Sequence, residues 1–212
     1  MGRTIADLAG RDSQLTISSE VDVGESIEAG IKSCDVAIDF SAADAAANIC
    51  SLAVAAKRPL VIGTTGHTAD QKKCIESTAA MVPIVFASNF SIGVNVLFWL
   101  TGKATRLLGK NFSPEIVETH HVMKKDAPSG TAKTLAEIIK SKRDEAEIPI
   151  RSIREGEIVG EHTVTFSGPG ERLELTHRAA SRETFASGAL AAAKWVIGKP
   201  PGLYSMQDVL GL

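Results

Sequence analysis

The densest group of chemically competent side chains lies in residues 118–131, which read ETHHVMKKDAPSGT. Imidazole titrates near neutrality and suits proton transfer, so His120 and His121 are candidates for that role. Neighbours on a strand point to opposite faces, and the two histidines therefore cannot play the same part. Lys124 and Lys125 add positive charge, and a desolvated lysine could donate a proton. The segment predicts a proton-transfer site, and a solvated loop is the alternative that the Pro-Ser-Gly turn makes less favoured.

Two further features could bind carboxylates. The backbone N–H groups of Gly130 and Thr131, at the start of an expected helix, would hold one carboxylate. Ser129 acting only as the N-cap of that helix is the alternative. Arg182 follows an expected strand that ends at His177, and its guanidinium could clamp a second carboxylate. Taken alone, Arg182 is better explained as half of a surface salt bridge.

Small polar residues follow three of the expected strands. Ligands of open parallel sheets lie beyond the carboxyl ends of strands, where small residues let a cofactor approach the backbone. The candidates are Asp22, the run Gly63-Thr64-Thr65 and the run Ala87-Ser88-Asn89. Asp22 lies 20 residues after Gly2, the spacing of a ribose-binding acid in dinucleotide sites. Plain turns, and a solvated aspartate at position 22, are the alternatives that spacing alone leaves open.

Short apolar runs alternate with helical patterns over the first 90 residues. Gly, Ser and Thr turns join them, which is typical of a parallel sheet with helices on its faces. Ser41 is the expected N-cap of the second helix. We expect strands at residues 15–23, 35–40, 59–63 and 83–87, and helices at residues 4–9 and 42–57 and from residue 68 or 70 to residue 80.

The pattern changes after residue 90 and predicts a second, α+β part with a more antiparallel sheet. Gly168-Pro169-Gly170 is most simply a hairpin turn between two of its strands. We expect helices at residues 92–108, 131–142 and 186–197, and strands at residues 115–121, 151–153, 162–166 and 172–177.

Composition excludes several classes of protein. The 212 residues, of which 44% are hydrophobic and 23% charged, can form one large domain or two small ones. A net charge of −2 and 5% aromatic residues argue against a nucleic-acid partner. Residues 90–100 are far shorter than the ~20 apolar residues of a membrane helix, and no apolar signal segment follows Met1. Cys34, Cys50 and Cys74 favour free thiols over a disulfide or a zinc site. We therefore expect a cytoplasmic protein without a metal or membrane partner.

At EIVETHHVMKKDAPSGTA the chain resembles the dihydrodipicolinate reductase (4-hydroxy-tetrahydrodipicolinate reductase) family. The resemblance continues through DVAIDFS, VIGTTG, ASNFSIGVNV, GEHTVTF, GERLELTHRAASRETFASGA and GLYSMQDVL. It implies a nicotinamide-dependent enzyme of diaminopimelate and lysine biosynthesis, in the compact form of the family. It also implies a doubly wound Rossmann-like domain over residues 1–90 and 183–212. Residues 91–182 would then form a substrate-binding and oligomerisation domain with a mixed sheet, in a homotetramer.

The same resemblance implies roles for single residues. His120 would be the proton donor or acceptor and Lys124 the proton-donating lysine. The other substrate-binding residues would be His121, Gly130, Thr131 and Arg182. Asp22 would bind the adenine ribose of NADH or NADPH, and Met1 would belong to the pyrophosphate loop. The residues that would line the nicotinamide are Gly63, Thr64, Thr65, Ala87, Ser88, Asn89 and Phe90. The implied reaction is hydride transfer to a ring conjugated to an imine, in a substrate with two carboxylates.

One departure from the family bears on the cofactor. Family members open with a strand and a loop of the type Gly-x-x-Gly-Arg-Met-Gly, and here only Met1-Gly2 corresponds to it. The resemblance therefore implies a missing first strand and weakened dinucleotide binding. Two functions stay open. The intact residues His120, Lys124 and Arg182 favour the reductase, whereas the short loop favours a dicarboxylate-binding protein that has lost productive cofactor binding.

Overall fold

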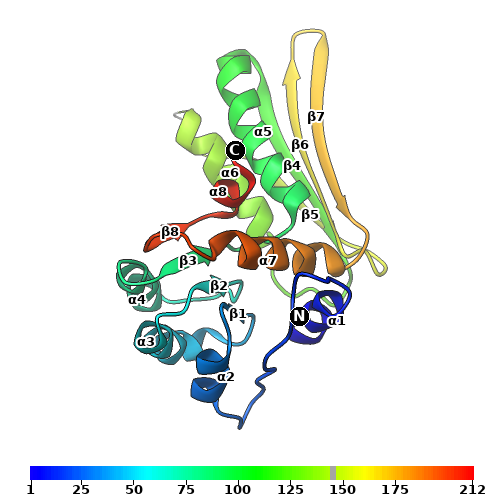
Figure 1. Ribbon diagram of the computed structural model, residues 1–212. Helices are drawn as coiled ribbons and strands as arrows, with labels where there is room; N and C mark the ends of the chain where they lie inside the picture. Colours follow the sequence, from blue (N-terminus) through cyan, green and yellow to red (C-terminus); the bar gives the residue numbers. More distant parts are fainter. Residues whose placement is uncertain (144–146) are drawn as a thin grey trace. The chain divides into compact units, whose positions relative to one another are not determined.

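The polypeptide divides into two units in the computed structural model, which describes residues 1–143 and 147–212 (Figure 1). Unit 1 comprises residues 1–91 and 185–211, and unit 2 comprises residues 92–184 with Leu212. The chain therefore leaves unit 1 after its third strand and returns to it in a late helix, so unit 1 is built from both ends of the sequence.

A four-stranded parallel sheet in the order β1-β2-β3-β8 forms the centre of unit 1. Its strands are β1 (Ala37–Asp39), β2 (Leu60–Ile62), β3 (Pro83–Phe86) and β8 (Gly202–Tyr204). Every residue of β2 is buried, as expected of a strand that is covered on both faces.

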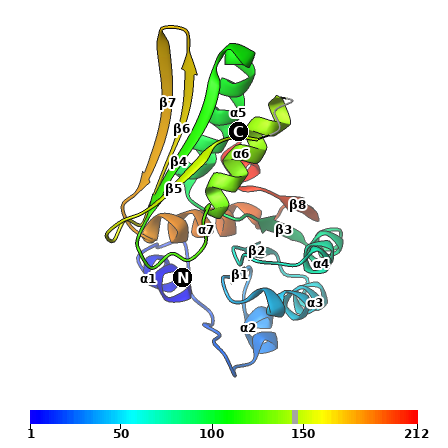
Figure 2. The same ribbon diagram turned by 180° about the vertical axis from the view of Figure 1, so that it is seen from behind.

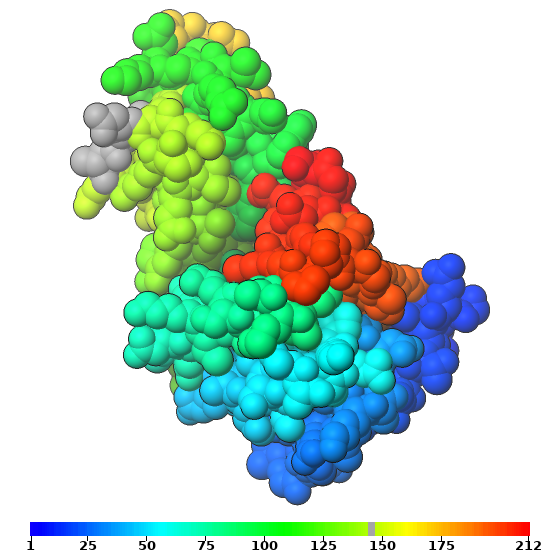
Figure 3. Space-filling model, turned by 60° about the vertical axis from the view of Figure 1, so that its left-hand side comes forward, coloured from blue at the N-terminus to red at the C-terminus, as the bar shows by residue number. Residues whose placement is uncertain are grey.

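Helices cover both faces of this sheet (Figure 1). Figure 3 shows one side of the molecule, where the orange and red C-terminal residues of unit 1 lie against its cyan and blue N-terminal residues. Leu60, Ile62 and Ile84 share a core with α2 (Ile27–Ser33), α3 (Ala46–Ala56) and α4 (Ala69–Ala79), and the short helix η1 (Ala43–Ala45) precedes α3. Val61 and Val85 face the other way, into a core with α1 (Gly2–Ala9), α7 (Glu183–Val196) and α8 (Met206–Leu210). The doubly wound α/β arrangement predicted from the sequence is confirmed.

Unit 2 contains a mixed sheet in the order β5-β4-β6-β7 (Figure 2). Strand β4 (Ser113–His120) runs parallel to β5 (Ile150–Arg154) and antiparallel to β6 (Gly160–Gly168). A two-residue turn with Gly170 at φ +77° joins β6 to its antiparallel neighbour β7 (Glu171–Ala179). Helices α5 (Ile92–Leu108) and α6 (Gly130–Lys142) pack on one face, against Ile116, Val164 and Phe166; the short helix η2 (Gly109–Asn111) follows α5.

Two expectations for unit 1 are wrong. Residues 15–23 form no strand, because no strand of the described sheet pairs with them. Val21 lies against α2 instead, with its Cγ2 2.6 Å from where a Cβ on Gly30 would be. Ser41 does not cap the helix that follows it. Its hydroxyl and its N–H both donate to Asp39 Oδ1, at 2.5 and 2.9 Å, and Ala42 stands at the N-cap of η1.

Among the described residues, four elements have no counterpart among the expected ones: α2, the short helix η2, β8 and α8. Each is seven residues or shorter, so its hydrophobic periodicity is brief. Two of them carry N-cap signals. Ser26 accepts from Ala29 N–H, and Ser205 forms a capping box with Asp208.

A glycine sets how closely α7 approaches the loop after β3. A Cβ on Gly188 would lie 1.7 Å from the carbonyl oxygen of Phe90. The obstacle is backbone, which a rotamer change cannot move. Gly188 therefore fixes the position of the loop that carries residues 87–90.

We predict that Gly188→Ala destabilises the protein by about 2 kcal/mol, because the methyl group forces α7 away from the Phe90 carbonyl. Urea unfolding followed by circular dichroism measures the change. Ser187→Ala, at the exposed neighbouring position of the same helix, is the control and should change the free energy of unfolding by less than about 0.5 kcal/mol. Equal stability of the two variants would contradict the prediction.

Candidate active site

The carboxyl edge of the unit 1 sheet brings two of the expected cofactor segments together. Ala87 N–H donates to the Ile62 carbonyl at 3.2 Å, which joins the start of the loop after β3 to the end of β2. A Cβ on Gly63 would lie 2.2 Å from the Phe40 ring, whose centroid is 5.5 Å from that of Phe90. The two loops, residues 63–65 and 87–90, therefore pack around Phe40.

A buried carboxylate holds the first of these loops, residues 63–65. Asp39, at the end of β1, is 6% exposed and accepts hydrogen bonds from Ser41 and from Thr64 Oγ1, the latter at 2.9 Å. Thr65 is exposed, and Asn89 Oδ1 accepts the N–H of Ser91 at 2.8 Å. Thr64 is thus a positioned group and Thr65 an accessible one.

The other two expected cofactor residues lie in the N-terminal part of unit 1. Met1 stands at the N-cap of α1 and packs against the unit 1 core, without a side-chain hydrogen bond to the helix. Asp22 is exposed in the loop before α2, where its carboxylate accepts the N–H of Val23 at 2.7 Å. No hydrogen bond among the described residues joins Asp22 to residues 63–65 or 87–90.

A fully buried carboxylate, Glu118, is the centre of a polar cluster in unit 2. Arg154 donates to both of its oxygens, from Nη1 to Oε2 at 3.0 Å and from Nη2 to Oε1 at 2.9 Å. The N–H of Ser129 donates to Oε1 at 3.3 Å, and His120 Nδ1 forms a hydrogen bond with Oε2. The strands explain the grouping, since Glu118 and His120 are two residues apart on β4 and Arg154 ends the neighbouring β5.

These partners decide the charge of Glu118. Burial alone would raise the pKa of its carboxyl, but hydrogen bonds from Arg154, Ser152 and His120 outweigh burial and lower the pKa to about 2. Glu118 is therefore ionised at every pH at which the protein would work, and it acts only as a hydrogen-bond acceptor.

The two histidines beside Glu118 are neutral near pH 7. Burial lowers the pKa of His120, and the hydrogen bond and charge of Glu118 oppose only part of that shift. Burial lowers the pKa of His162 further, to about 3, and repulsion from His120 adds to the effect. The His162 ring stands edge-on to His120, with ring centroids 5.0 Å apart, and its Nε2 lies 3.1 Å from the hydroxyl of Ser129.

Glu118, His120 and His162 lie close enough together to hold a metal ion. Their hydrogen bonds argue against that role. The guanidinium of Arg154 already occupies both carboxylate oxygens, and a divalent cation there would face a buried positive charge. The residues present thus fit a hydrogen-bonded network better than a metal centre.

The residues expected to bind substrate differ in their contacts with this cluster. Lys124 forms an ion pair with Asp126 at 2.8 Å, and the Asp126 carbonyl accepts from Arg154 at 2.6 Å. His121 follows directly after β4, and its N–H donates to the Ile158 carbonyl. Gly130 and Thr131 form the first turn of α6, for which Ser129 is the N-cap.

Arg182 is the exception among the expected substrate residues. It is exposed between β7 and α7, and no hydrogen bond or ion pair among the described residues joins it to the Glu118 cluster. The other carboxylate-binding candidates, Gly130 and Thr131, begin α6 directly after Ser129, whose N–H donates to Glu118.

Sequence reasoning missed Glu118, Arg154 and His162. A signal for the first was present, because Ile116, Glu118 and His120 share one strand face and Ile116 belongs to the core. His162 alternates in the same way with Val164 and Phe166. Charged or titratable groups on a core-facing strand position must be paired, so the alternation could have indicated a buried network. Arg154 carries no such signal, because its partner lies 36 residues away.

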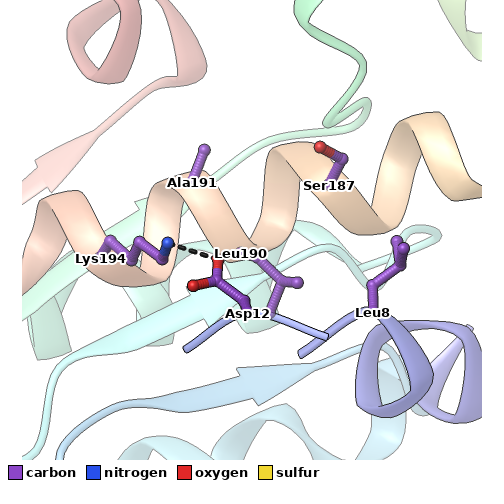
Figure 4. A pocket seen from close by; sticks show the side chains of 6 residues that line it. All are labelled: Leu8, Asp12, Ser187, Leu190, Ala191 and Lys194. Carbon is purple, nitrogen blue, oxygen red and sulfur yellow. Dashed lines mark hydrogen bonds and ion pairs between the residues drawn. The ribbon is translucent and has the colours of Figure 1, made fainter. Parts of the chain in front are cut away.

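A cavity of about 320 Å³ lies elsewhere in unit 1, between α1 and α7 (Figure 4). Leu8 and Leu190 line it together with an ion pair in which Lys194 Nζ lies 2.5 Å from Asp12 Oδ2. The charges at its edge are thus already satisfied by each other, and it contains none of the residues expected to bind substrate or cofactor.

The fold and the polar loops define a class of protein. A doubly wound sheet with small hydroxyl residues at its carboxyl edge, followed by a mixed sheet with a buried histidine network, is the organisation of a Rossmann-like, nicotinamide-dependent oxidoreductase. Family models for the N-terminus and the C-terminus of dihydrodipicolinate reductase match residues 1–90 and 93–210. The chain belongs to the dihydrodipicolinate reductase family.

Relatives and a solved structure agree with this assignment. The chain is 48% identical to the 4-hydroxy-tetrahydrodipicolinate reductase of Akkermansia muciniphila, over 100% of this chain and 94% of that protein. It is 44% identical to the enzyme of the same name from Syntrophus aciditrophicus, over 99% and 84% of the two chains. A dipicolinate-bound dihydrodipicolinate reductase from Paenisporosarcina sp. TG-14 has the same fold, with a TM-score of 0.82 and 24% sequence identity. The match covers 98% of this chain and 94% of that one.

Among the helices of the described residues, none combines the length and the hydropathy that a membrane span requires. The longest, α5, has 17 residues.

We predict that Arg154→Met lowers the free energy of unfolding at pH 7 by about 3 kcal/mol, because it leaves the Glu118 carboxylate buried without its cation. Urea unfolding at several pH values measures this. Arg151→Met is the control, since Arg151 is exposed on the same strand and should change stability little.

The same series tests the charge of Glu118. Because its folded-state pKa is about 2, below the ordinary 4.5, its pairing stabilises the protein above pH 4.5 and less as the pH falls toward 2. The difference in free energy of unfolding between wild type and Arg154→Met should therefore become smaller as the pH falls from 4.5 to 2. A difference that stays constant down to pH 2.5 would show that Arg154 does not hold Glu118 ionised.

Proposed function

We propose that this chain reduces the dehydrated form of 4-hydroxy-tetrahydrodipicolinate to tetrahydrodipicolinate with NADH or NADPH, in diaminopimelate and lysine biosynthesis. The observation that carries the proposal is the buried Glu118–His120 pair at the start of the Lys124 segment, in a chain that belongs to the reductase family over its whole length. Full-length identity to reductases favours this function over a binding protein without cofactor.

The substrate side of the proposal rests on unit 2. The first-turn N–H groups of α6, at Gly130 and Thr131, suit one carboxylate of the substrate. His121, Lys124 and Arg182 would bind the other polar groups, with Arg182 supplying a guanidinium for a carboxylate. That the Paenisporosarcina reductase is bound to dipicolinate, a dicarboxylate, supports a small dicarboxylate as substrate.

Proton transfer is proposed for His120 and Lys124. His120 is neutral near pH 7, since burial lowers the pKa of its imidazole, and can accept a proton or relay one. Lys124 is half-buried and holds its ammonium group by the ion pair with Asp126. An ammonium near the reacting ring can both donate a proton and stabilise negative charge.

Unit 1 would hold the dinucleotide, and residues 1–90 with 183–212 are the proposed domain for it. Thr65 is exposed, and a Cβ on the neighbouring Gly66 would meet no atom within 4 Å, so a ligand can approach the backbone there. Gly63, Thr64, Ala87, Ser88, Asn89 and Phe90 would position the nicotinamide, Asp22 the ribose and Met1 the pyrophosphate. When bound, the nicotinamide supplies the hydride.

We predict that Lys124→Met lowers kcat about 100-fold and leaves KM within a few-fold, because it removes a proton donor and not the first turn of α6. NAD(P)H oxidation with enzymatically generated substrate is the measurement. Lys125→Met, at the adjacent exposed lysine, is the matched control and should keep wild-type kinetics. An unchanged kcat in Lys124→Met would remove this lysine from the mechanism.

A homotetramer built through residues 91–182 and a cytoplasmic location complete the proposal. The sheet face of unit 2 that points away from α5 and α6 carries small, half-buried residues such as Thr119 and Thr163, a surface suited to a second copy. The free thiols Cys34, Cys50 and Cys74 are compatible with a reducing compartment.

We predict that Thr163→Arg dissociates the tetramer, because a long cationic side chain would replace a small one on the proposed interface. Light scattering after size exclusion should give four times the chain mass for wild type and a smaller species for the variant. Glu137→Arg, on the exposed side of α6, should leave the mass unchanged. A wild-type protein that elutes as a monomer would refute the assembly.

A further inference from the structure

We propose that Glu118 is a positioning residue for the reaction: by accepting the hydrogen of His120 Nδ1 it fixes the neutral imidazole with Nε2 free of hydrogen, so that Nε2 is the atom that exchanges a proton. The inference rests on the proposed function, in which His120 handles protons. It assigns a part to a fully buried group that does not itself touch the reacting atoms.

The direction of the His120 hydrogen bond follows from the other contacts of Glu118. Its two oxygens already accept three hydrogen bonds, two from Arg154 and one from the Ser129 N–H. A carboxylate so bonded carries no hydrogen and can only accept. The hydrogen between Glu118 and His120 must therefore sit on Nδ1, and the neutral ring has its lone pair on Nε2.

Arg154 keeps Glu118 in this orientation. Its guanidinium also donates to the carbonyls of Ile153 and Asp126, at 2.7 and 2.6 Å. Backbone groups of β5 and of the loop before α6 therefore fix its position. The Asp126 contact also ties the network to the segment that carries Lys124. One planar cation thus orients the carboxylate and holds the second proposed proton-transfer group nearby.

The Nε2 side of His120 is bounded by small or neutral neighbours. A Cβ on Gly160 would lie 3.0 Å from Nε2, so any other residue there would crowd the atom. His162 faces the ring from β6 and is neutral. The charged groups that act on His120 are Glu118 from its own strand, Arg154 from β5 and Lys124 from the following loop.

A glutamine at position 118 distinguishes positioning from simple packing. Its amide has one acceptor oxygen and one NH2 group, and Arg154 and Ser129 both require acceptors. An amide oxygen at the Oε1 position satisfies Ser129 and Arg154 Nη2, and the NH2 group then takes the Oε2 position, facing His120 and Arg154 Nη1. That arrangement favours the opposite tautomer, with the hydrogen on Nε2, while the shape of the side chain is conserved. Loss of the carboxylate charge also lowers the pKa of His120 further.

The experiment combines NMR and kinetics. Ring-nitrogen spectra of 15N-histidine-labelled wild type, with His120 assigned by difference from His120→Gln, should show the Nδ1–H tautomer at pH 8. Glu118→Gln should show the Nε2–H tautomer, a kcat about 100-fold lower, a KM within about threefold and an acidic limb of the kcat profile moved to lower pH. Glu118→Asp keeps the charge and should recover part of kcat. Glu137→Gln, at an exposed position of α6, should behave as wild type.

The outcomes separate this inference from the proposed function. An Nε2–H tautomer in wild type, or a Glu118→Gln variant that keeps kcat within twofold, overturns the positioning role. If Glu118→Gln does not fold, the wild-type tautomer and the Glu118→Asp kinetics decide instead. Absence of NAD(P)H oxidation by wild type would refute the proposed function, whereas the tautomer measurement would still report on Glu118 and His120.

Discussion

The ion pair between Glu118 and Arg154 is the interaction on which the arrangement of unit 2 depends. A carboxylate with no exposed surface is unfavourable in a protein interior unless its hydrogen-bonding capacity is filled. Filling it requires β4, β5, the turn before α6 and the N-cap of that helix to meet at one point. The same requirement places His120, Lys124 and the first turn of α6 in one region, so a single electrostatic constraint organises groups with different proposed roles.

In unit 1, the loops of the candidate cofactor site are held in place without a buried ion pair between described residues. Its loops at the carboxyl edge of the sheet are fixed by packing around Phe40 and by neutral donors on Asp39. The contrast fits what each unit is proposed to do. A dinucleotide is held by many backbone and hydroxyl contacts spread over several loops, whereas proton transfer needs one ring nitrogen in one protonation state.

Much of this architecture could be predicted because hydrophobic periodicity is a local property. Helix α5 occupies the predicted residues 92–108, and β3 and α4 lie within one residue of their predicted starts. The strand expected at residues 15–23 was wrong because a strand is defined by its partner, which a sequence window does not contain. The motif at residues 118–131 drew attention to His120 and Lys124, but the partners of Glu118 come from residues as distant as Arg154. Such pairing depends on strand register, which no single segment encodes.

The division of unit 1 between the two ends of the chain has a consequence for biosynthesis. Its core joins Ile5 and Ala9 of α1 to seven residues of α7 and α8, which are synthesised after unit 2. Unit 2 is nearly contiguous, so it can complete its core while unit 1 still lacks one covering layer. During that interval Val61 and Val85 would have no helix α7 over them, and a hydrophobic sheet face would be open to solvent. Until α7 has been synthesised, nascent chains should therefore expose an apolar sheet face of unit 1 that can promote aggregation.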